Sequence, residues 1–155
     1  MLFATLLGGC SADQVARLER ENKMLAEKLE ASTKAVKLDG QDRCAQQALR
    51  YYQASEIGRR NAGGYTNHYS VELSKCFIEM GETSAKQGVI SVSRTLVDAF
   101  EGKSYGEYYW TNPEKKKYWE VKPYVCMVTD LDGKEVDCVT DQEYGTLIKR
   151  YMEHK

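Results

Sequence analysis

Hydrophobic residues recur at helical spacing in the first part of the chain. Residues 13–38 contain neither Gly nor Pro and are rich in Ala, Leu, Glu and Lys, a composition that favours a helix. A seven-residue repeat runs through this segment, and its a and d positions include Val15, Leu18, Asn22, Leu25, Leu29 and Val36. A seam with one polar asparagine is typical of parallel coiled coils. Residues 15–36 are therefore a candidate homodimer contact, and the alternative is a solvated monomeric helix that spaces a domain from a membrane.

Two further helices are expected. Apolar residues at helical spacing predict one over residues 42–57, and Asp39-Gly40 is expected to separate it from the first helix. Near the C-terminal end Thr140 and Glu143 form a capping box. The residues that follow at i, i+3, i+4 and i+7 are Tyr144, Leu147, Ile148 and Tyr151. This apolar stripe must pack on another element, most simply on a sheet.

Alternating apolar and polar residues predict strands between these helices. The expected strands are residues 75–80, 89–97, 105–110, 118–129 and 135–139. Cys76 and Ile78 are expected on one face and Phe77 on the other. Residues 58–64 and 81–88 are expected as loops, and the segment from Tyr65 is compatible with strand or helix. The predicted fold class is α+β: an N-terminal helical stalk, then a small mostly antiparallel sheet packed by flanking helices.

Five cysteines divide into one near the N-terminus and four in the rest of the chain. Cys126 and Cys138 flank a segment that predicts a hairpin with a three-residue loop at 131–133, ending in a left-handed glycine. Counting outward from this loop sets the two cysteines directly opposite each other, close to disulfide range. Cys44 then pairs with Cys76 by elimination. Four paired cysteines are typical of an exported domain stapled by two disulfides.

The first residues form a short apolar run that ends in Leu7-Gly8-Gly9-Cys10, and polar sequence begins at Ser11. This pattern resembles the lipobox of bacterial lipoproteins, in which a signal peptide is cut before a cysteine that becomes lipid-modified. The resemblance implies lipidation at Cys10 and a lipid anchor in the cell envelope. Because Ser rather than Asp follows the cysteine, it also implies an outer-membrane position that faces the periplasm.

Length and charge limit the class of protein. The 155 residues allow one compact domain plus an extension. We expect residues 1–9 to be a truncated signal peptide, 10–39 the lipid anchor and helical stalk, and 40–155 the α+β globular domain. The 22 basic and 23 acidic residues give a net charge of −1. A nucleic-acid partner is therefore disfavoured, since such proteins usually carry a basic excess.

An aromatic cluster on two predicted strands is the candidate binding surface. Its members are Tyr105, Tyr108, Tyr109, Trp110, Tyr118 and Trp119, together with Tyr124. Alternation places Tyr108 and Trp110 on one face and Tyr105 and Tyr109 on the other. We expect one face to belong to the core, while the second can stack on a sugar ring or a peptide. The alternative is that the rings serve core packing and cross-strand pairing alone.

The sequence predicts no catalytic residues, no cofactor and no metal site. The opening of a calcium loop at Asp130-x-Asp132-Gly133 is explained by the hairpin turn. We therefore expect a non-enzymatic envelope lipoprotein that binds a partner protein or an envelope polymer, peptide or glycan, through the aromatic-rich surface. One alternative is an envelope enzyme with a cleft around His68, which lies eight residues before Cys76. The other is a purely structural spacer.

Overall fold

A computed structural model describes residues 12–112, 116 and 120–153. The chain divides into two compact units, residues 1–38 and 39–155. The described residues of the first unit are all helical and belong to helix α1 (Ala12–Ala54). Several apolar heptad residues of this unit are exposed, namely Val15, Leu18, Leu25, Leu29 and Val36. None of the helices in the described part of the chain has the length and apolar character needed to cross a bilayer.

Helix α1 is continuous through Asp39-Gly40, where the sequence predicted a break. Gly40 is buried, and a Cβ atom built on it would lie 2.2 Å from Cε1 of Tyr69. The glycine therefore permits a close approach of helical backbone to a tyrosine ring. Cys44 and Ala48 follow at intervals of four residues and are also buried, so the three residues lie along one side of the helix. Packing of this side offsets the intrinsic helix penalty of glycine, about 1 kcal/mol.

A short helix, α2 (Glu56–Arg60), follows α1, although the segment from Gly58 was expected to be a loop. Ser55 caps its first turn, because the Ser55 hydroxyl accepts a hydrogen bond from the Gly58 N–H at 3.1 Å. Asn61 ends the helix in the left-handed conformation, with φ 50°. These two caps bound the short helix between α1 and the first strand.

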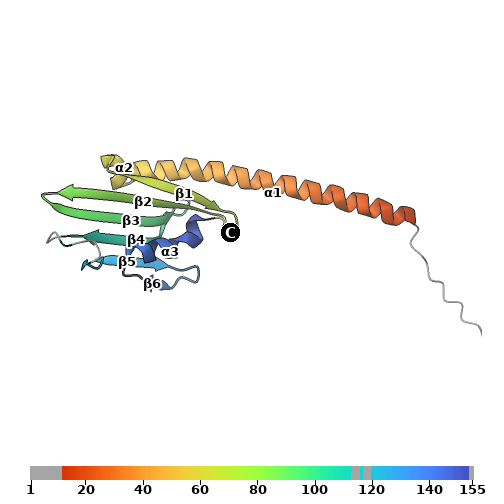
Figure 1. The fold of residues 1–155 in the computed structure, drawn as a ribbon. Coiled ribbons are helices and arrows are strands. Elements are labelled where there is room, and N and C mark those ends of the chain that lie inside the picture. The colour runs from red at the N-terminus through yellow and green to blue at the C-terminus, as the bar shows by residue number, and fades with distance from the viewer. Residues whose placement is uncertain (1–11, 113–115, 117–119, 154–155) are drawn as a thin grey trace, which may run out of the picture. The chain divides into compact units, whose positions relative to one another are not determined.

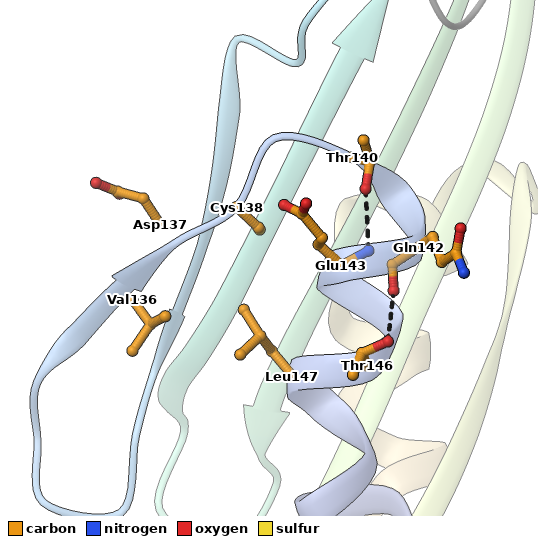
Figure 2. Close-up of a pocket in the computed structure, with 8 residues that line it drawn as sticks. All are labelled: Val136, Asp137, Cys138, Thr140, Gln142, Glu143, Thr146 and Leu147. Carbon is orange, nitrogen blue, oxygen red and sulfur yellow. Dashed lines mark hydrogen bonds between the residues drawn. The ribbon is translucent and has the colours of Figure 1, made fainter.

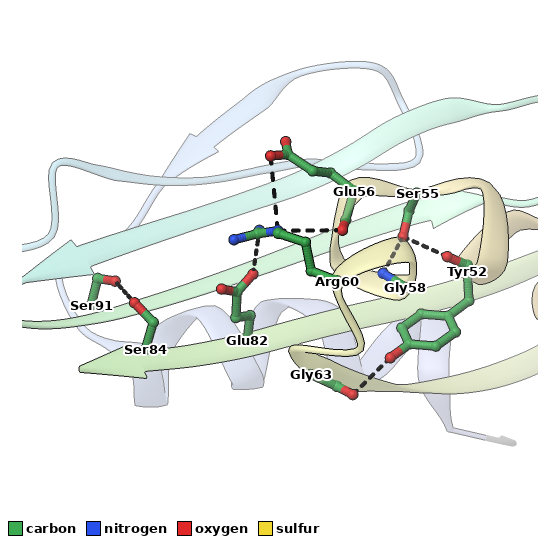
Figure 3. A network of polar contacts seen from close by, with 9 residues as sticks. All are labelled: Tyr52, Ser55, Glu56, Gly58, Arg60, Gly63, Glu82, Ser84 and Ser91. Carbon is green, nitrogen blue, oxygen red and sulfur yellow. Dashed lines mark hydrogen bonds and ion pairs between the residues drawn. The ribbon is translucent and has the colours of Figure 1, made fainter. Parts of the chain in front are cut away.

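Two polar contacts tie α2 and the end of α1 to the sheet, as Figure 3 shows. Nη2 of Arg60 lies 2.7 Å from Oε2 of Glu82. The hydroxyl of Tyr52 donates to the carbonyl oxygen of Gly63 at 2.7 Å. Together they fix the point at which the chain enters the sheet.

Six strands in the described residues form one antiparallel sheet in sequence order (Figure 1). They are β1 (Gly63–Ser70), β2 (Lys75–Lys86), β3 (Val89–Asp98), β4 (Lys103–Thr111), β5 (Val125–Thr129) and β6 (Glu135–Asp137). The segment from Tyr65, left open by the sequence, is strand. Among the described residues β5 starts only at Val125, although a strand was expected from residue 118. With helix α3 (Asp141–Met152), the predicted α+β class is confirmed.

The β2–β3 hairpin is longer than the sequence indicated. Gln87 and Gly88 form its two-residue turn, with φ 52° and 81°, and two residues at positive φ are the signature of a type I′ turn. The arm that was missed is residues 81–86 of β2, which are mostly polar and show no alternation, whereas the opposite arm was predicted from residue 89. Near the turn the hydroxyls of Ser84 and Ser91 form a cross-strand hydrogen bond of 2.9 Å (Figure 3).

Buried apolar residues lie on both faces of the sheet. One cluster lies between the sheet and the C-terminal part of α1. It contains Cys44 and Ala48 of the helix together with Cys76, Ile78, Met80, Val97 and Ala99. The other packs against α3 and includes Phe77, Leu96, Tyr105, Tyr108, Trp110, Val128, Tyr144, Ile148 and Tyr151. The neighbours Cys76 and Phe77 belong to different clusters, which confirms their predicted placement on opposite faces.

Both predicted disulfides are confirmed. The Cα atoms of Cys44 and Cys76 are 5.2 Å apart, and those of Cys126 and Cys138 are 5.0 Å apart. Gly133 has φ 82° in the hairpin loop, as the predicted turn requires. The first disulfide joins α1 to β2, and the second closes the β5–β6 hairpin.

The predicted capping box of α3 is present. The Glu143 N–H donates to the Thr140 hydroxyl oxygen at 3.1 Å, and the Glu143 carboxylate accepts the N–H of Val139 at 2.8 Å. The second contact reaches one residue further back than in the standard motif. The predicted stripe faces the sheet, with Tyr144, Ile148 and Tyr151 buried and Leu147 half-buried.

Candidate functional site

The predicted aromatic surface is largely part of the core. Tyr108 and Trp110 are buried and pack in the cluster beneath α3. Tyr105 joins the same cluster, although alternation placed it on the face of Tyr109. The pairing of β3 with β4 shifts register next to Tyr105, and such an irregularity re-aims a side chain. The expectation that Tyr105 and Tyr109 share a face is therefore wrong.

Tyr109 remains exposed on the other face of the sheet, with 42% of its surface accessible. Tyr124 lies beside it and is 65% exposed. The two ring centroids are 6.2 Å apart, and the Tyr124 N–H donates to the Tyr109 carbonyl oxygen at 2.8 Å. Tyr118 and Trp119 lie outside the described residues. The exposed aromatic surface in the described chain is thus centred on Tyr109 and Tyr124.

His68 does not form a pair with a reactive cysteine. It lies in β1 directly opposite Phe77, whereas Cys76 is opposite Tyr69. Cys76 is bonded to Cys44, and a disulfide sulfur has no thiolate with which to act as a nucleophile. The shared helix face that would bring His68 and Cys76 together does not exist, because this segment is a hairpin.

A charged cluster that the sequence did not reveal joins α3 to the sheet. Arg94 forms ion pairs with Glu79 and with Asp141, and Nη1 lies 2.6 Å from Oδ1 of Asp141. The Arg94 guanidinium carbon is 5.0 Å from the ring centroid of Tyr144. Burial lowers the pKa of Arg94. The hydrogen bonds to Asp141 and Glu79 and the charges of these two carboxylates raise the pKa by a larger amount, so the net shift is upward. The carboxylates of Glu79 and Asp141 both pair with Arg94, so this cluster holds α3 to the sheet, and we call it the Arg94 tether.

The two buried tyrosines of α3 differ in their polar contacts. The Tyr144 hydroxyl is buried and has no hydrogen-bond partner among the described residues. Burial, with a further contribution from the charge of Glu79, raises the pKa of Tyr144. The hydroxyl of Tyr151 donates to the Thr129 carbonyl oxygen at 2.6 Å.

Asp98 organises the turn between β3 and β4. Its side chain is fully buried, and Oδ1 accepts the N–H of Cys76 at 3.3 Å and the N–H of Phe100 at 3.0 Å. Oδ2 lies 2.9 Å from Nζ of Lys75, which also pairs with Glu101 at 2.6 Å. The hydrogen bond to Glu101 and the contacts with Asp98 outweigh burial and raise the pKa of Lys75. This buried carboxylate therefore has a structural role.

The candidate binding site is a cavity of about 600 Å³ between β6 and α3 (Figure 2). The strand side contributes Val136, Asp137 and Cys138. The helix side contributes Thr140, Gln142, Glu143, Thr146 and Leu147. Figure 2 shows Val136 and Leu147 on the two walls, with the Glu143 carboxylate between Cys138 and Thr140. Most of the lining side chains are polar, so the cavity offers hydrogen-bonding groups beside the apolar surface of Val136 and Leu147.

A second cavity, of about 400 Å³, adjoins the first, because both are lined by Thr140 and Gln142. Val121 and Pro123 supply apolar surface, and the remaining lining residues are Tyr108, Glu120, Lys122 and Val139. In the described residues, no group of three His, Cys, Asp or Glu side chains is arranged to hold a metal ion. Each of the two cavities combines apolar and polar lining residues.

Comparison of the chain with protein-family models, with curated proteins and with solved structures finds no match. Its function is therefore inferred from the residues and contacts described above.

Proposed function

We propose that this chain is an envelope lipoprotein, held by lipid on Cys10, whose domain binds a partner protein or an envelope polymer. The pair of disulfides carries this proposal. Cys44–Cys76 and Cys126–Cys138 use four of the five cysteines, and structural disulfides persist in oxidising compartments. The fifth is the cysteine of the lipobox-like motif. The proposed location is the outer membrane, facing the periplasm.

Intact mass of the protein from its native envelope tests this proposal, measured before and after reduction and alkylation. We expect an N-terminal Cys10 with a lipid adduct and four alkylated thiols that appear only after reduction. Cys10→Ser is the control variant, and it should keep both disulfides but lose the lipid mass and the membrane fractionation. Five thiols that alkylate without reduction, in a chain that retains residues 1–9, would contradict the proposal.

The proposed contact with a partner or polymer is the exposed pair Tyr109 and Tyr124. Their rings lie side by side on a face of the sheet, 6.2 Å apart. Exposed tyrosines combine a large apolar face with a polar tip, which suits stacking on sugar rings and contacts with peptides. Tyr108 and Trp110 support this surface from the core below and are not proposed to touch a ligand.

Retention of the protein on envelope material tests the contact. The double variant Tyr109→Ala, Tyr124→Ala should lose most of the retention and keep its fold. Val71→Ala is a matched control, because Val71 is apolar and 42% exposed on a distant turn. Equal retention of all forms would contradict the aromatic contact, and no retention of any form would favour the structural spacer.

We also propose that residues 15–36 form a contact between two copies of the chain. Their apolar a and d side chains are exposed within the first unit. In a parallel, in-register pair each of them would be buried against its counterpart, and Asn22 would meet Asn22. Two linked domains would raise the avidity of a weak surface.

A further inference from the structure

Strand β6 is the last strand of the described sheet, and no described strand lies on its outer side. The Cys138 N–H donates to the Cys126 carbonyl oxygen at 2.9 Å, which fixes the phase of the β5–β6 pairing. Alternate residues of an antiparallel strand direct their backbone groups to the same side. Val136 therefore directs its N–H and C=O toward β5, and Glu135 and Asp137 direct theirs outward.

The 600 Å³ cavity is lined by β6 and α3 and therefore borders this edge strand. Val136 is paired with Val128, which belongs to the core beneath α3, so the Val136 side chain is on the α3 side of the sheet. Leu147 of α3 lines the same cavity and is half-buried. A residue placed opposite Val136 on an added strand would project to this side and fill the space against Leu147.

The other side of β6 is acidic. Glu135 and Asp137 are exposed and project away from α3, because side chains alternate along a strand. Residues 130–138 contain four acidic side chains and one basic side chain, Lys134. The edge therefore attracts positive charge at the strand that borders the cavity.

We propose that β6 accepts an extended peptide segment of a partner protein as a seventh strand, with the pattern basic–apolar–basic. The apolar residue enters the cavity between Val136 and Leu147, and the two basic residues lie opposite Glu135 and Asp137. Backbone hydrogen bonds supply affinity for any extended chain, and the alternating side chains supply selectivity. This inference rests on the proposed binding function and narrows the partner to a protein segment.

Titration of the intact, oxidised protein with a labelled, end-blocked peptide Thr-Lys-Val-Lys-Thr tests the inference. We expect saturable binding and slower hydrogen exchange at the amides of Glu135 and Asp137. A Thr-Glu-Val-Glu-Thr peptide should bind about tenfold more weakly or worse, because two attractive exposed ion pairs are replaced by two repulsive ones. A Thr-Lys-Val-Lys-Thr peptide that is methylated at the backbone nitrogens of both lysines keeps its charge. It cannot donate backbone hydrogen bonds to β6, so it should also lose binding.

A charge swap provides the matching protein variants. Glu135→Lys, Asp137→Lys should bind the glutamate peptide in preference to the lysine peptide. Glu72→Lys, Glu153→Lys changes net charge equally at exposed sites elsewhere and should keep the original preference. Leu147→Ala should weaken binding of both peptides to the swapped and unswapped proteins.

Several results would overturn the strand addition. They are equal binding of the N-methylated peptide, an unchanged preference in the swapped variant, or no binding at millimolar peptide. Protection of Glu135 and Asp137 that rises with protein concentration in the absence of peptide would assign the edge to a second copy. If the protein binds no peptide but is still retained on envelope material through Tyr109 and Tyr124, only the strand addition is rejected. Peptide binding without envelope retention would reject the aromatic contact instead.

Discussion

The ring of Tyr69 occupies the space that a side chain at Gly40 would need. A Cβ atom at Gly40 would lie 2.2 Å from Cε1 of this ring, and Tyr69 also packs edge-on against Phe100. We predict that Gly40→Ala lowers the free energy of unfolding by about 1–3 kcal/mol, the usual cost of overpacking. Urea unfolding of the oxidised protein would measure the change.

Gly145 of α3 provides the matched control. It is also helical, but a Cβ atom there would meet nothing within 4 Å. Gly145→Ala should therefore raise the free energy of unfolding by roughly 0.5–1 kcal/mol, because alanine loses less conformational entropy in a helix. Changes of the same sign in the two variants would show that close packing does not explain Gly40.

The buried tyrosines of α3 should respond in opposite ways to loss of their hydroxyls. Tyr144→Phe removes a buried hydroxyl without a partner among the described residues, and we predict equal or greater stability. Tyr151→Phe removes the 2.6 Å hydrogen bond to the Thr129 carbonyl oxygen and should cost about 1 kcal/mol. Thermal unfolding at neutral pH would compare the two, and a larger loss for Tyr144→Phe would contradict the assignment.

Stability should fall in alkaline solution. Burial raises the pKa of Tyr144 and of Tyr151 above the value in the unfolded chain, about 10. Above that pH the unfolded state loses protons that the folded state keeps, so the free energy of unfolding decreases by up to about 1.4 kcal/mol per pH unit for each group. Below about pH 10 the contribution is fully present. Unfolding curves from neutral to strongly alkaline pH would test this, and Tyr144→Phe should have the shallower decrease.

The structure could be predicted correctly from the sequence where several local signals agreed. The hairpin between Cys126 and Cys138 could be predicted because loop length, Gly133 and cysteine spacing all require one register. The cap and stripe of α3 were likewise visible within a single short segment. These features depend on neighbours in the chain, which periodicity and turn chemistry describe well.

The errors concern contacts between distant residues. Gly40 predicts the end of a helix as long as the contact between this glycine and the ring of Tyr69 is unknown. Arg94 finds its partners Glu79 and Asp141 at sequence separations of 15 and 47 residues, which no local pattern indicates. The cavity at β6 was missed for a similar reason, because the position of that strand at the sheet edge follows only from the complete strand order.

Loss of the Arg94 tether should destabilise the domain. Arg94→Met keeps much of the side-chain volume but leaves the half-buried Glu79 and Asp141 without their cation. We expect a loss of about 2–4 kcal/mol, since the Glu79 side chain is only 17% exposed and would be left without a cation. Arg17→Met is the control, because the Arg17–Glu21 pair on α1 is exposed and such pairs contribute about 0–1 kcal/mol. Equal losses in urea unfolding would contradict the tether.

Cysteine cross-linking should reveal the proposed contact between two copies of residues 15–36. In a Cys10→Ser background, Leu25→Cys places a thiol at a d position and Met24→Cys places one outside the seam. A parallel, in-register pair brings the two thiols introduced by Leu25→Cys together across the seam, so mild oxidation should link this variant about tenfold more than Met24→Cys at equal concentration. Adding Leu29→Asp, which buries a charge in the seam, should abolish this difference. Equal linking at both positions, or linking that survives Leu29→Asp, would show that the helix is monomeric or pairs in another register.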